Sequence, residues 1–195
     1  GLVLQDTGTY WSTFGQVVII CLIQIGGLGF MTIATLFLLL LRRRLGLRER
    51  EVMVSSVSYG RLGGLSAFVR QIFLGTLLAE GVGAALLSMR FVQDFGWGRG
   101  IYYGVWHAVS AFCNGGFDLM GPHSGPFSSF TAYAGDPLVS LTLCALILVG
   151  GAGFLVWDDL LRCRHHWRRY RLQTKVVLFV NLVLVAGGAV LFLLL

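Results

Sequence analysis

The chain alternates between long runs of apolar residues and short stretches that are rich in arginine. A helix that spans about 30 Å of hydrocarbon needs roughly 20 apolar residues. Four runs reach or nearly reach that length, at residues 14–41, 68–91, 138–161 and 176–195. The first is longer than one crossing requires, so we expect it to tilt or to break near the glycines at 26–29. The pattern predicts an all-α, polytopic membrane protein.

A fifth apolar run, at residues 101–112, is shorter. As a helix its 12 residues would reach about 18 Å, roughly half a bilayer. The sequence C-N-G-G at 113–116, directly after this run, is expected to stop the helix. A half-helix that enters the membrane and returns leaves non-helical backbone at membrane depth, which must be buried in protein or line a water-filled path. We therefore predict a re-entrant half-helix that ends in a glycine loop.

An external surface loop with an interfacial helix is the alternative for this region. Aromatic residues gather at membrane interfaces, and this stretch contains Trp97, Tyr102, Tyr103 and Trp106. The residues alone leave both interpretations open.

The basic residues predict the orientation of the chain, because cytoplasmic loops carry an excess of Lys and Arg. The first and second long runs are separated by Arg42, Arg43, Arg44, Arg48, Arg50 and Arg61, with Arg70 at the start of the second run. The third and fourth are separated by Arg162, Arg164, Arg168, Arg169, Arg171 and Lys175. Between the second and third there is only Arg99, with Arg90 at the edge. We expect the first and third loops to be cytoplasmic, and the central segment and the N-terminal end to be external.

Composition supports a membrane protein, because 56% of the residues are hydrophobic and 12% are charged, against about 25% charged in soluble domains. The formal charge of +6 is concentrated at the ends of apolar runs. This is a topology pattern, so we do not expect nucleic acid as a partner. The four cysteines are widely spaced, without a C-x-x-C pair, and indicate no disulfide framework. No signal peptide is visible and both ends look cut, so we expect the chain to be a fragment.

An internal repeat links the first and third long runs. The sequence L-I-Q-I-G-G-L-G-F at 22–30 matches L-I-L-V-G-G-A-G-F at 146–154 with an offset of 124 residues. Small residues are common wherever transmembrane helices pack closely. Two copies at equivalent positions favour a shared task, which is to leave room for the adjacent glycine loop. The glycines concerned are Gly26, Gly27, Gly29, Gly150, Gly151 and Gly153.

Polar residues near the loop have two interpretations each. Glu80 lies inside the second run, where a carboxylate is costly and a function is the default hypothesis. A structural acid paired to a polar loop or helix end is the interpretation we favour. His107 and Ser110 are expected to support the loop by packing and hydrogen bonding. Asp118 could attract cations at an outer mouth or cap a turn.

An enzyme is not expected. His107, Cys113 and Asp118 include the residue types of a nucleophilic triad. However, His107 and Cys113 are six residues apart across a helix end, and no second acid–base group lies near them. The G-G-F-D string also lacks the G-x-G-D order of intramembrane aspartyl proteases. A metal site at Cys163, His165 and His166 is disfavoured by the basic residues around it.

Three segments carry a resemblance to a known family. They are G-Q-V-V-I-I-C-L-I-Q-I-G-G-L-G-F-M-T at 15–32, H-A-V-S-A-F-C-N-G-G-F at 107–117 and L-V-G-G-A-G-F at 148–154. They resemble the Trk/Ktr/HKT superfamily of potassium transporters. The likeness to the membrane subunit of bacterial Ktr and Trk systems covers essentially the whole chain, and the order of the motifs makes it more specific than any glycine pattern.

The resemblance implies helix–pore-loop–helix repeats around one ion path, where filter strands bind K+ through backbone carbonyls. By similarity to the second pore helix and filter, the filter residues would be Cys113, Asn114, Gly115 and Gly116, with Phe117 supporting them. Gly116 matches the filter glycine, whereas Cys113 departs from the Asn or similar polar residue of the family pattern. The opening G-L-V-L-Q-D-T-G-T resembles the segment directly after the first filter, so Gly1 would be the first filter glycine.

On this mapping the chain is a single incomplete membrane domain. Residues 1–50 would end repeat one, 51–170 would form repeat two with its pore loop at about 101–117, and 171–195 would begin repeat three. The resemblance also implies a homodimer in the cell (inner) membrane, in contact with lipid and with a cytoplasmic nucleotide-binding regulatory ring.

The predicted function is potassium uptake through a carbonyl-lined filter. K+ would be the transported ion, with Na+ or H+ as coupling ion in some members of the family, and no covalently bound cofactor is expected. The alternative is a non-transporting assembly or regulatory membrane protein with structural glycine loops.

Overall fold

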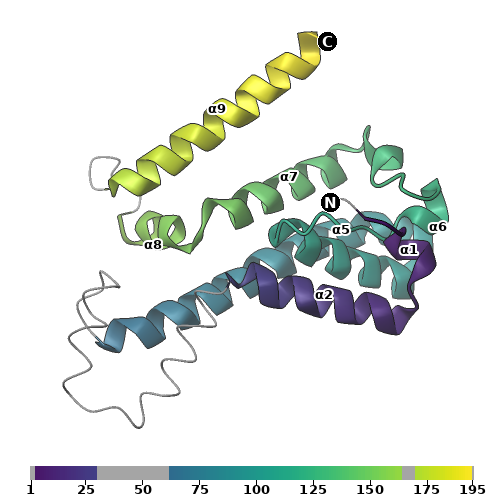
Figure 1. Cartoon of the computed structure of the whole chain (residues 1–195), viewed down its shortest axis with the longest axis horizontal. Coiled ribbons are helices and arrows are strands. Elements are labelled where there is room, and N and C mark those ends of the chain that lie inside the picture. Colours follow the sequence, from purple (N-terminus) through teal and green to yellow (C-terminus); the bar gives the residue numbers. More distant parts are fainter. Residues whose placement is uncertain (1–2, 30–61, 164–169, 195) are drawn as a thin grey trace.

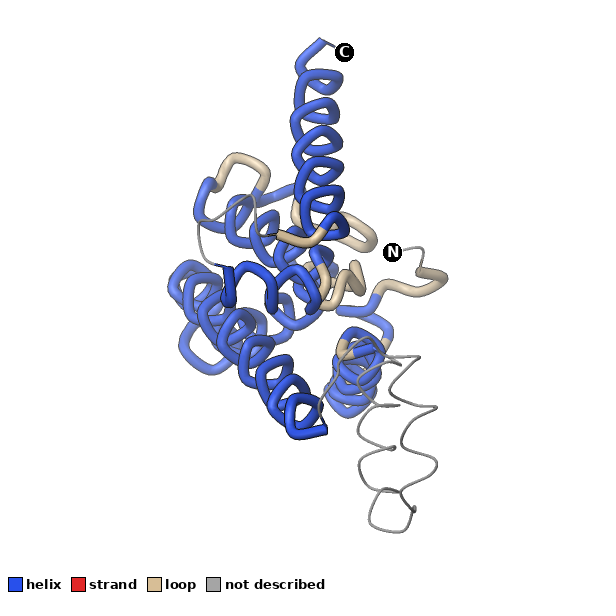
Figure 2. Tube along the Cα trace, turned by 90° about the vertical axis from the view of Figure 1, so that its left-hand side faces the viewer, coloured by secondary structure: helices blue, strands red, loops and turns tan. Residues whose placement is uncertain are grey.

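The computed structural model describes residues 3–29, 62–163 and 170–194, and all regular structure in these ranges is helical (Figures 1 and 2). The elements are α1 (Thr7–Tyr10), α2 (Thr13–Gly27), α5 (Leu62–Phe112), α6 (Gly121–Ser124), the 3-10 helix η2 (Thr131–Tyr133), α7 (Pro137–Ala152), α8 (Phe154–Cys163) and α9 (Leu172–Leu194). The expectation of an all-α protein is confirmed for these residues.

The long helix α5 reverses direction at Gly96. Its φ of 76° and ψ of 171° belong to a region that is open only to glycine. Beyond it, Gly100 lies against Val92, and Gly104 lies against Ser88 and Ala84. The two arms of α5, residues 62–95 and 97–112, therefore run antiparallel. The predicted half-helix at 101–112 is the end of the second arm, and it stops at Phe112 as expected.

Small residues make this reversal tight. Gly100 and Gly104 are four residues apart on one arm, and Ala84 and Ser88 have the same spacing on the other. Such spacing lets two helix backbones approach closely. A Cβ at Gly100 would lie 2.5 Å from the Cα of Val92 and 2.8 Å from the carbonyl carbon of Phe91.

We predict that Gly100→Ala destabilises the protein by about 2 kcal/mol, because the clash is with backbone and cannot be relieved by a side-chain rotation. The measurement is the midpoint of thermal unfolding in detergent, which should fall by roughly 4–8 °C. Gly98→Ala is the matched control, since a Cβ there would meet no described atom within 4 Å. Equal midpoints for the two variants would contradict the tight reversal.

The core lies where the two arms of α5 meet α7. A buried stripe runs along the first arm with steps of three or four residues, as expected for one helix face. Its members are Ile72, Thr76, Glu80, Gly83, Leu87 and Phe91. The apolar members Leu87 and Phe91 join a cluster that includes Phe112 and Leu146. Two polar residues, Thr76 and Glu80, therefore stand in the middle of an otherwise apolar stripe.

Both copies of the repeated glycine motif lie at the end of a helix. The helix α2 ends at Gly27 and is followed by Gly29 with φ 81°, while α7 ends at Ala152 and is followed by Gly153 with φ 84°. Gly29 and Gly153 are related by the offset of 124 residues. The predicted break near 26–29 is confirmed. The prediction of one continuous span over 138–161 is wrong, because Gly153 divides it into α7 and α8.

Two helical stretches of the described residues are long and apolar enough to cross a membrane, namely Arg70–Phe112 and Leu172–Leu191. The first is divided by the reversal at Gly96. Two shorter apolar helices are Thr13–Gly27 and Pro137–Ala152. In Figure 1, α9 extends away from α2 and α5, and it contacts α7 and α8. These features agree with a membrane protein; four complete crossings stay a prediction.

An ionic clamp joins the end of the first arm of α5 to the start of α7. Arg90 donates to Asp136 at 2.6 Å and to Asp94 at 2.8 Å, and Tyr133 donates to Asp94 at 2.7 Å. Asp136 also accepts the backbone N–H groups of Leu138 and Val139, so it caps α7. The hydrogen bond from Arg90 holds the pKa of Asp136 below its usual range. The clamp fixes the position of α7 relative to α5, and α7 is the helix that packs beside the glycine loop.

Candidate functional site

The glycine loop at 113–117 lies beside the middle of the first arm of α5. From the reversal at Gly96, both Glu80 and Cys113 are about 16 residues away along their arms, or about 24 Å of helix. Their side chains are indeed neighbours, with Cys113 Sγ 3.8 Å from a carboxylate oxygen of Glu80. The second arm, residues 97–112, thus ends about halfway along the first, and it is four residues longer at its start than the predicted half-helix at 101–112.

Backbone hydrogen bonds end the second arm in a defined way. The N–H of Gly115 donates to the carbonyl of Ser110 at 2.8 Å, and the N–H of Asn114 donates to that of Ala111 at 3.1 Å. This pair of bonds is the Schellman motif, which requires a left-handed residue after the helix. Asn114 takes that place with φ 55°, a conformation that Asn tolerates better than most residues. The C-N-G-G sequence therefore encodes a specific helix end.

The loop leaves its backbone carbonyls open. In the described part of the chain, the carbonyl oxygens of Cys113, Asn114 and Gly115 accept no hydrogen bond. Asn114 and Gly116 are exposed, while Cys113 and Gly115 are half-buried. Gly116 has φ 70°, a left-handed conformation that favours glycine. These three carbonyl oxygens are therefore available to a partner from outside the described residues, such as water or a cation.

Two side chains of the second arm hold the chain that leaves the loop. Ser110 Oγ donates to the carbonyl of Phe117 at 2.7 Å and accepts the N–H of the same residue at 3.1 Å. His107 Nε2 accepts the N–H of Leu119 at 2.9 Å, and Nδ1 lies 2.7 Å from the carbonyl of Tyr103. These contacts define the neutral tautomer with hydrogen on Nδ1. Both ends of the loop are therefore hydrogen-bonded to the helix that precedes it.

Two of the six repeat glycines approach the loop closely. A Cβ at Gly27 would collide with the side chain of Cys113, and a Cβ at Gly150 would collide with the carbonyl oxygen of Phe112. Gly151 is at an ordinary contact distance, 3.7 Å, from the side-chain amide of Asn114. At Gly26, Gly29 and Gly153, a Cβ would meet no described atom within 4 Å.

Glu80, on the buried stripe of α5, has partners from two segments. Gln24 of α2 donates to it at 3.2 Å, and the Cys113 thiol lies near it and near the amide oxygen of Gln24, each at 3.8 Å. Sequence reasoning missed Gln24, because it lies in a run of otherwise apolar residues. Its signal was an amide in the middle of a membrane-length run, where Gln16 is the other one.

Two acids near the segment that leaves the loop have structural contacts. Asp118 accepts the N–H of Met120 at 2.9 Å, as a turn cap does, and burial raises the pKa of its carboxyl. Asp6, which the sequence did not single out, is buried and accepts the N–H groups of Thr9 and Phe127. Gly1, the proposed first filter glycine, lies outside the described residues. His165 and His166 do too, and the described residues contain no group of three potential metal ligands.

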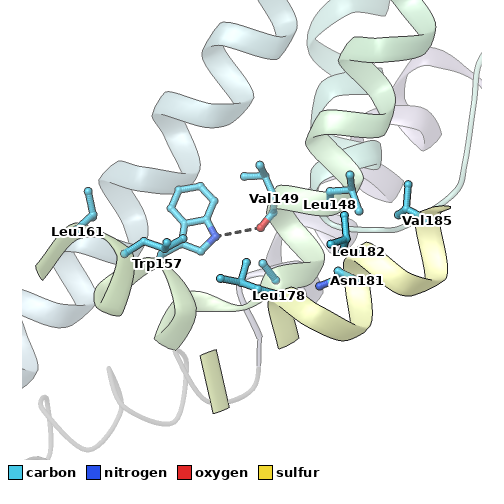
Figure 3. Close-up of a pocket in the computed structure, with 10 residues that line it drawn as sticks. Leu148, Val149, Trp157, Leu161, Leu178, Asn181, Leu182 and Val185 are labelled. Carbon is cyan, nitrogen blue, oxygen red and sulfur yellow. Dashed lines mark hydrogen bonds between the residues drawn. The ribbon is translucent and has the colours of Figure 1, made fainter. Parts of the chain in front are cut away.

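A separate hollow of about 570 Å³ lies between α7, α8 and α9 (Figure 3). Its lining is apolar apart from Asn181, so its chemistry does not suit a cation. Trp157 stands at its side and donates its indole N–H to the carbonyl of Val149 at 3.0 Å. That carbonyl is one of the last in α7, where the break at Gly153 removes helical partners. The indole thus stabilises the interrupted end of α7.

The described fold, with long apolar helices packed around an irregular glycine loop, is that of a helical membrane protein. The chain belongs to the TrkH family of cation transport proteins, whose model matches residues 1–195. It is 39% identical over 184 residues to the Ktr system potassium uptake protein B of Bacillus subtilis, covering 94% of this chain and 40% of that protein. It is 36% identical over 193 residues to the potassium/sodium uptake protein NtpJ of Enterococcus hirae, covering 99% and 41%.

A third relative is the Ktr system potassium uptake protein B of Vibrio alginolyticus, 37% identical over 98% of this chain and 41% of that protein. The chain thus spans about two fifths of the length of the relatives it matches. The resemblance read from the motifs is confirmed at the level of the family. The family consists of membrane transporters and not of enzymes, in agreement with the sequence-based expectation.

Proposed function

We propose that this chain supplies part of the ion path of a potassium uptake protein, and that backbone carbonyls of Cys113, Asn114, Gly115 and Gly116 line that path. The observation that carries the proposal is the loop itself. Three of its consecutive carbonyl oxygens accept no hydrogen bond from the described residues, although both ends of the loop are hydrogen-bonded to the helix that precedes it.

Carbonyl oxygens select cations by replacing the hydration shell of the ion. An open carbonyl has a lone pair available for this purpose, and a rigid loop keeps it in place before the ion arrives. The second arm of α5 also ends at the loop, so the negative end of its dipole favours a cation there. His107 and Ser110 would support this loop from its own helix, while Gly27 and Gly150 would let α2 and α7 approach it.

K+ is the proposed cargo, with Na+ or H+ as the ion that would drive coupled uptake. The names of the relatives support this, since they are called potassium or potassium/sodium uptake proteins. Two of them are named as parts of a Ktr system. We further propose that the protein is a homodimer in the cell membrane, with its N-terminal end external and its basic loops against a cytoplasmic nucleotide-binding regulatory ring.

Expression of the complete gene in a host that lacks potassium uptake tests the proposal. Growth at low potassium should be restored, and Gly116→Ser should weaken the apparent K+ affinity or the discrimination against Na+ by roughly tenfold, which corresponds to about 1.4 kcal/mol. The reason is that a side chain at φ 70° strains the loop and displaces its carbonyls. The measurements are the uptake KM for K+ and its inhibition by Na+.

Gly125→Ser is the matched control, because Gly125 also has a positive φ, of 100°, and no described atom lies near its Cβ position. It should retain the wild-type KM and discrimination. If Gly116→Ser behaves like this control, the filter assignment is wrong. If the complete gene does not restore growth, the non-transporting alternative replaces the proposed function.

A further inference from the structure

The side chain of Cys113 lies in a socket behind the proposed filter loop. The socket is formed by Gln24 and Gly27 of α2 and by Glu80 of α5. Gly27 leaves the space for the thiol, because a Cβ at that position would collide with it. Gln24 and Glu80 are joined to each other by a hydrogen bond of 3.2 Å, and each has an oxygen 3.8 Å from Cys113 Sγ.

The chemistry of the socket matches a thiol. A thiol has one hydrogen, so it donates to one of the two oxygens at a time, while the Gln24–Glu80 bond keeps both oxygens in place. Glu80 is only 6% exposed and stands on the buried stripe of α5. Polar groups in such surroundings are costly unless they are partnered. The three residues therefore satisfy one another, and the loss of one leaves the other two with incomplete hydrogen bonding.

The socket connects the loop to segments that are distant in sequence. Gln24 is 89 residues from Cys113, and Glu80 is 33 residues from it. The rest of the loop is held by its own helix through Ser110 and His107. Cys113 is thus the point at which the start of the loop is attached to the surrounding helices. A shift of Cys113 would carry Asn114 and Gly115 with it, because their Schellman bonds return to the same helix end.

We propose that Gln24 and Glu80 are positioning residues for ion selection, which act by holding the Cys113 side chain behind the filter loop. The consequence for selection rests on the proposed function, whereas the socket itself does not. The residues act through hydrogen bonds to the loop and do not touch the ion.

The first experiment uses the complete protein in the uptake assay. Glu80→Leu removes the hydrogen bonds and should reduce discrimination between K+ and Na+ by roughly tenfold. Glu80→Gln retains the size and an acceptor oxygen, and should stay within about twofold of the wild type. Thr76→Val is the matched control, one turn away on the same stripe, because the Thr76 hydroxyl has no hydrogen-bond partner among the described residues. It should leave discrimination unchanged.

The second experiment does not depend on transport. In the purified complete protein with every cysteine other than Cys113 replaced by alanine, including Cys21, Cys144 and Cys163, Cys113 is treated with a small maleimide. Labelling should be slow with Glu80 and Gln24 intact, and several-fold faster in Glu80→Leu, because the thiol leaves its socket. Gln24→Leu provides a second variant in case Glu80→Leu does not accumulate.

The outcomes separate the two proposals. Unchanged discrimination and unchanged labelling in the Leu variants would overturn the socket. An equal loss of discrimination in Glu80→Gln and Glu80→Leu would overturn it too, because charge rather than hydrogen bonding would then be responsible. If labelling accelerates as expected while Gly116→Ser leaves uptake unchanged, the socket stands and the filter assignment fails.

Discussion

Gly150→Ala is expected to be among the most damaging single substitutions in the described part of the chain. A Cβ on Gly150 would overlap the carbonyl oxygen of Phe112, the last residue of the helix that carries the loop. Neither group can rotate away, because both belong to helix backbone. We expect a loss of about 3 kcal/mol or more, at the upper end of overpacking costs. This would lower the unfolding midpoint in detergent by roughly 10 °C.

Gly151→Ala is the natural control, because Gly151 is the next residue of the same helix and is also a glycine. Its added Cβ would make an ordinary contact of 3.7 Å with the Asn114 amide. We expect it to unfold within about 2 °C of the wild type, since alanine is also a better helix former than glycine. A Gly150→Ala midpoint equal to that of Gly151→Ala would show that α7 does not press against the loop.

His107→Leu is the second substitution with a large expected effect. It keeps the side-chain volume similar but leaves the N–H of Leu119 without its acceptor, in a residue that is 1% exposed. A buried donor without a partner costs about 1–3 kcal/mol. Loss of the edge-to-face contacts of the imidazole with Phe91 and Phe130 adds to that cost. We expect the unfolding midpoint to fall by roughly 5–10 °C.

His123→Leu controls for the loss of an imidazole with its ring contacts, because His123 packs on the rings of Phe95 and Tyr103 but its described hydrogen bond is only to the exposed hydroxyl of Tyr103. It should shift the midpoint by less than about 2 °C. His107→Gln should recover part of the loss, since its amide oxygen can accept the Leu119 N–H. If His107→Gln and His107→Leu are equally destabilised, the hydrogen bond to Leu119 is not what the histidine provides.

Local sequence was sufficient for the elements that depend on local chemistry. The end of a helix at Phe112 and the interruption at 26–29 could be predicted because glycine and asparagine determine backbone conformation where they stand. The interruption at Gly153 was missed although the repeat contained it. The physical reason for a break at the first glycine motif applied equally to the second.

Contacts between distant segments could not be predicted from the pattern. The reversal at Gly96 depends on facing small residues that are 16–20 positions apart, and the socket depends on an amide 89 residues away from its thiol. Periodicity reports which face of a helix is apolar but not which helix it meets. The carbonyl collision at Gly150 is of the same kind, and the sequence predicted only that the motif would leave room for the loop.

The closure of the loop by its own helix also has a consequence for the order in which the protein is built. The bonds from His107 and Ser110 reach no further than Leu119, so they link residues within 12 positions of each other. Contacts between near neighbours in sequence form quickly, and chains fold from the N-terminus as they are synthesised. We therefore expect the loop to fold while α7 is still being synthesised. Gly150 would then pack against a helix end, at Phe112, that has already formed.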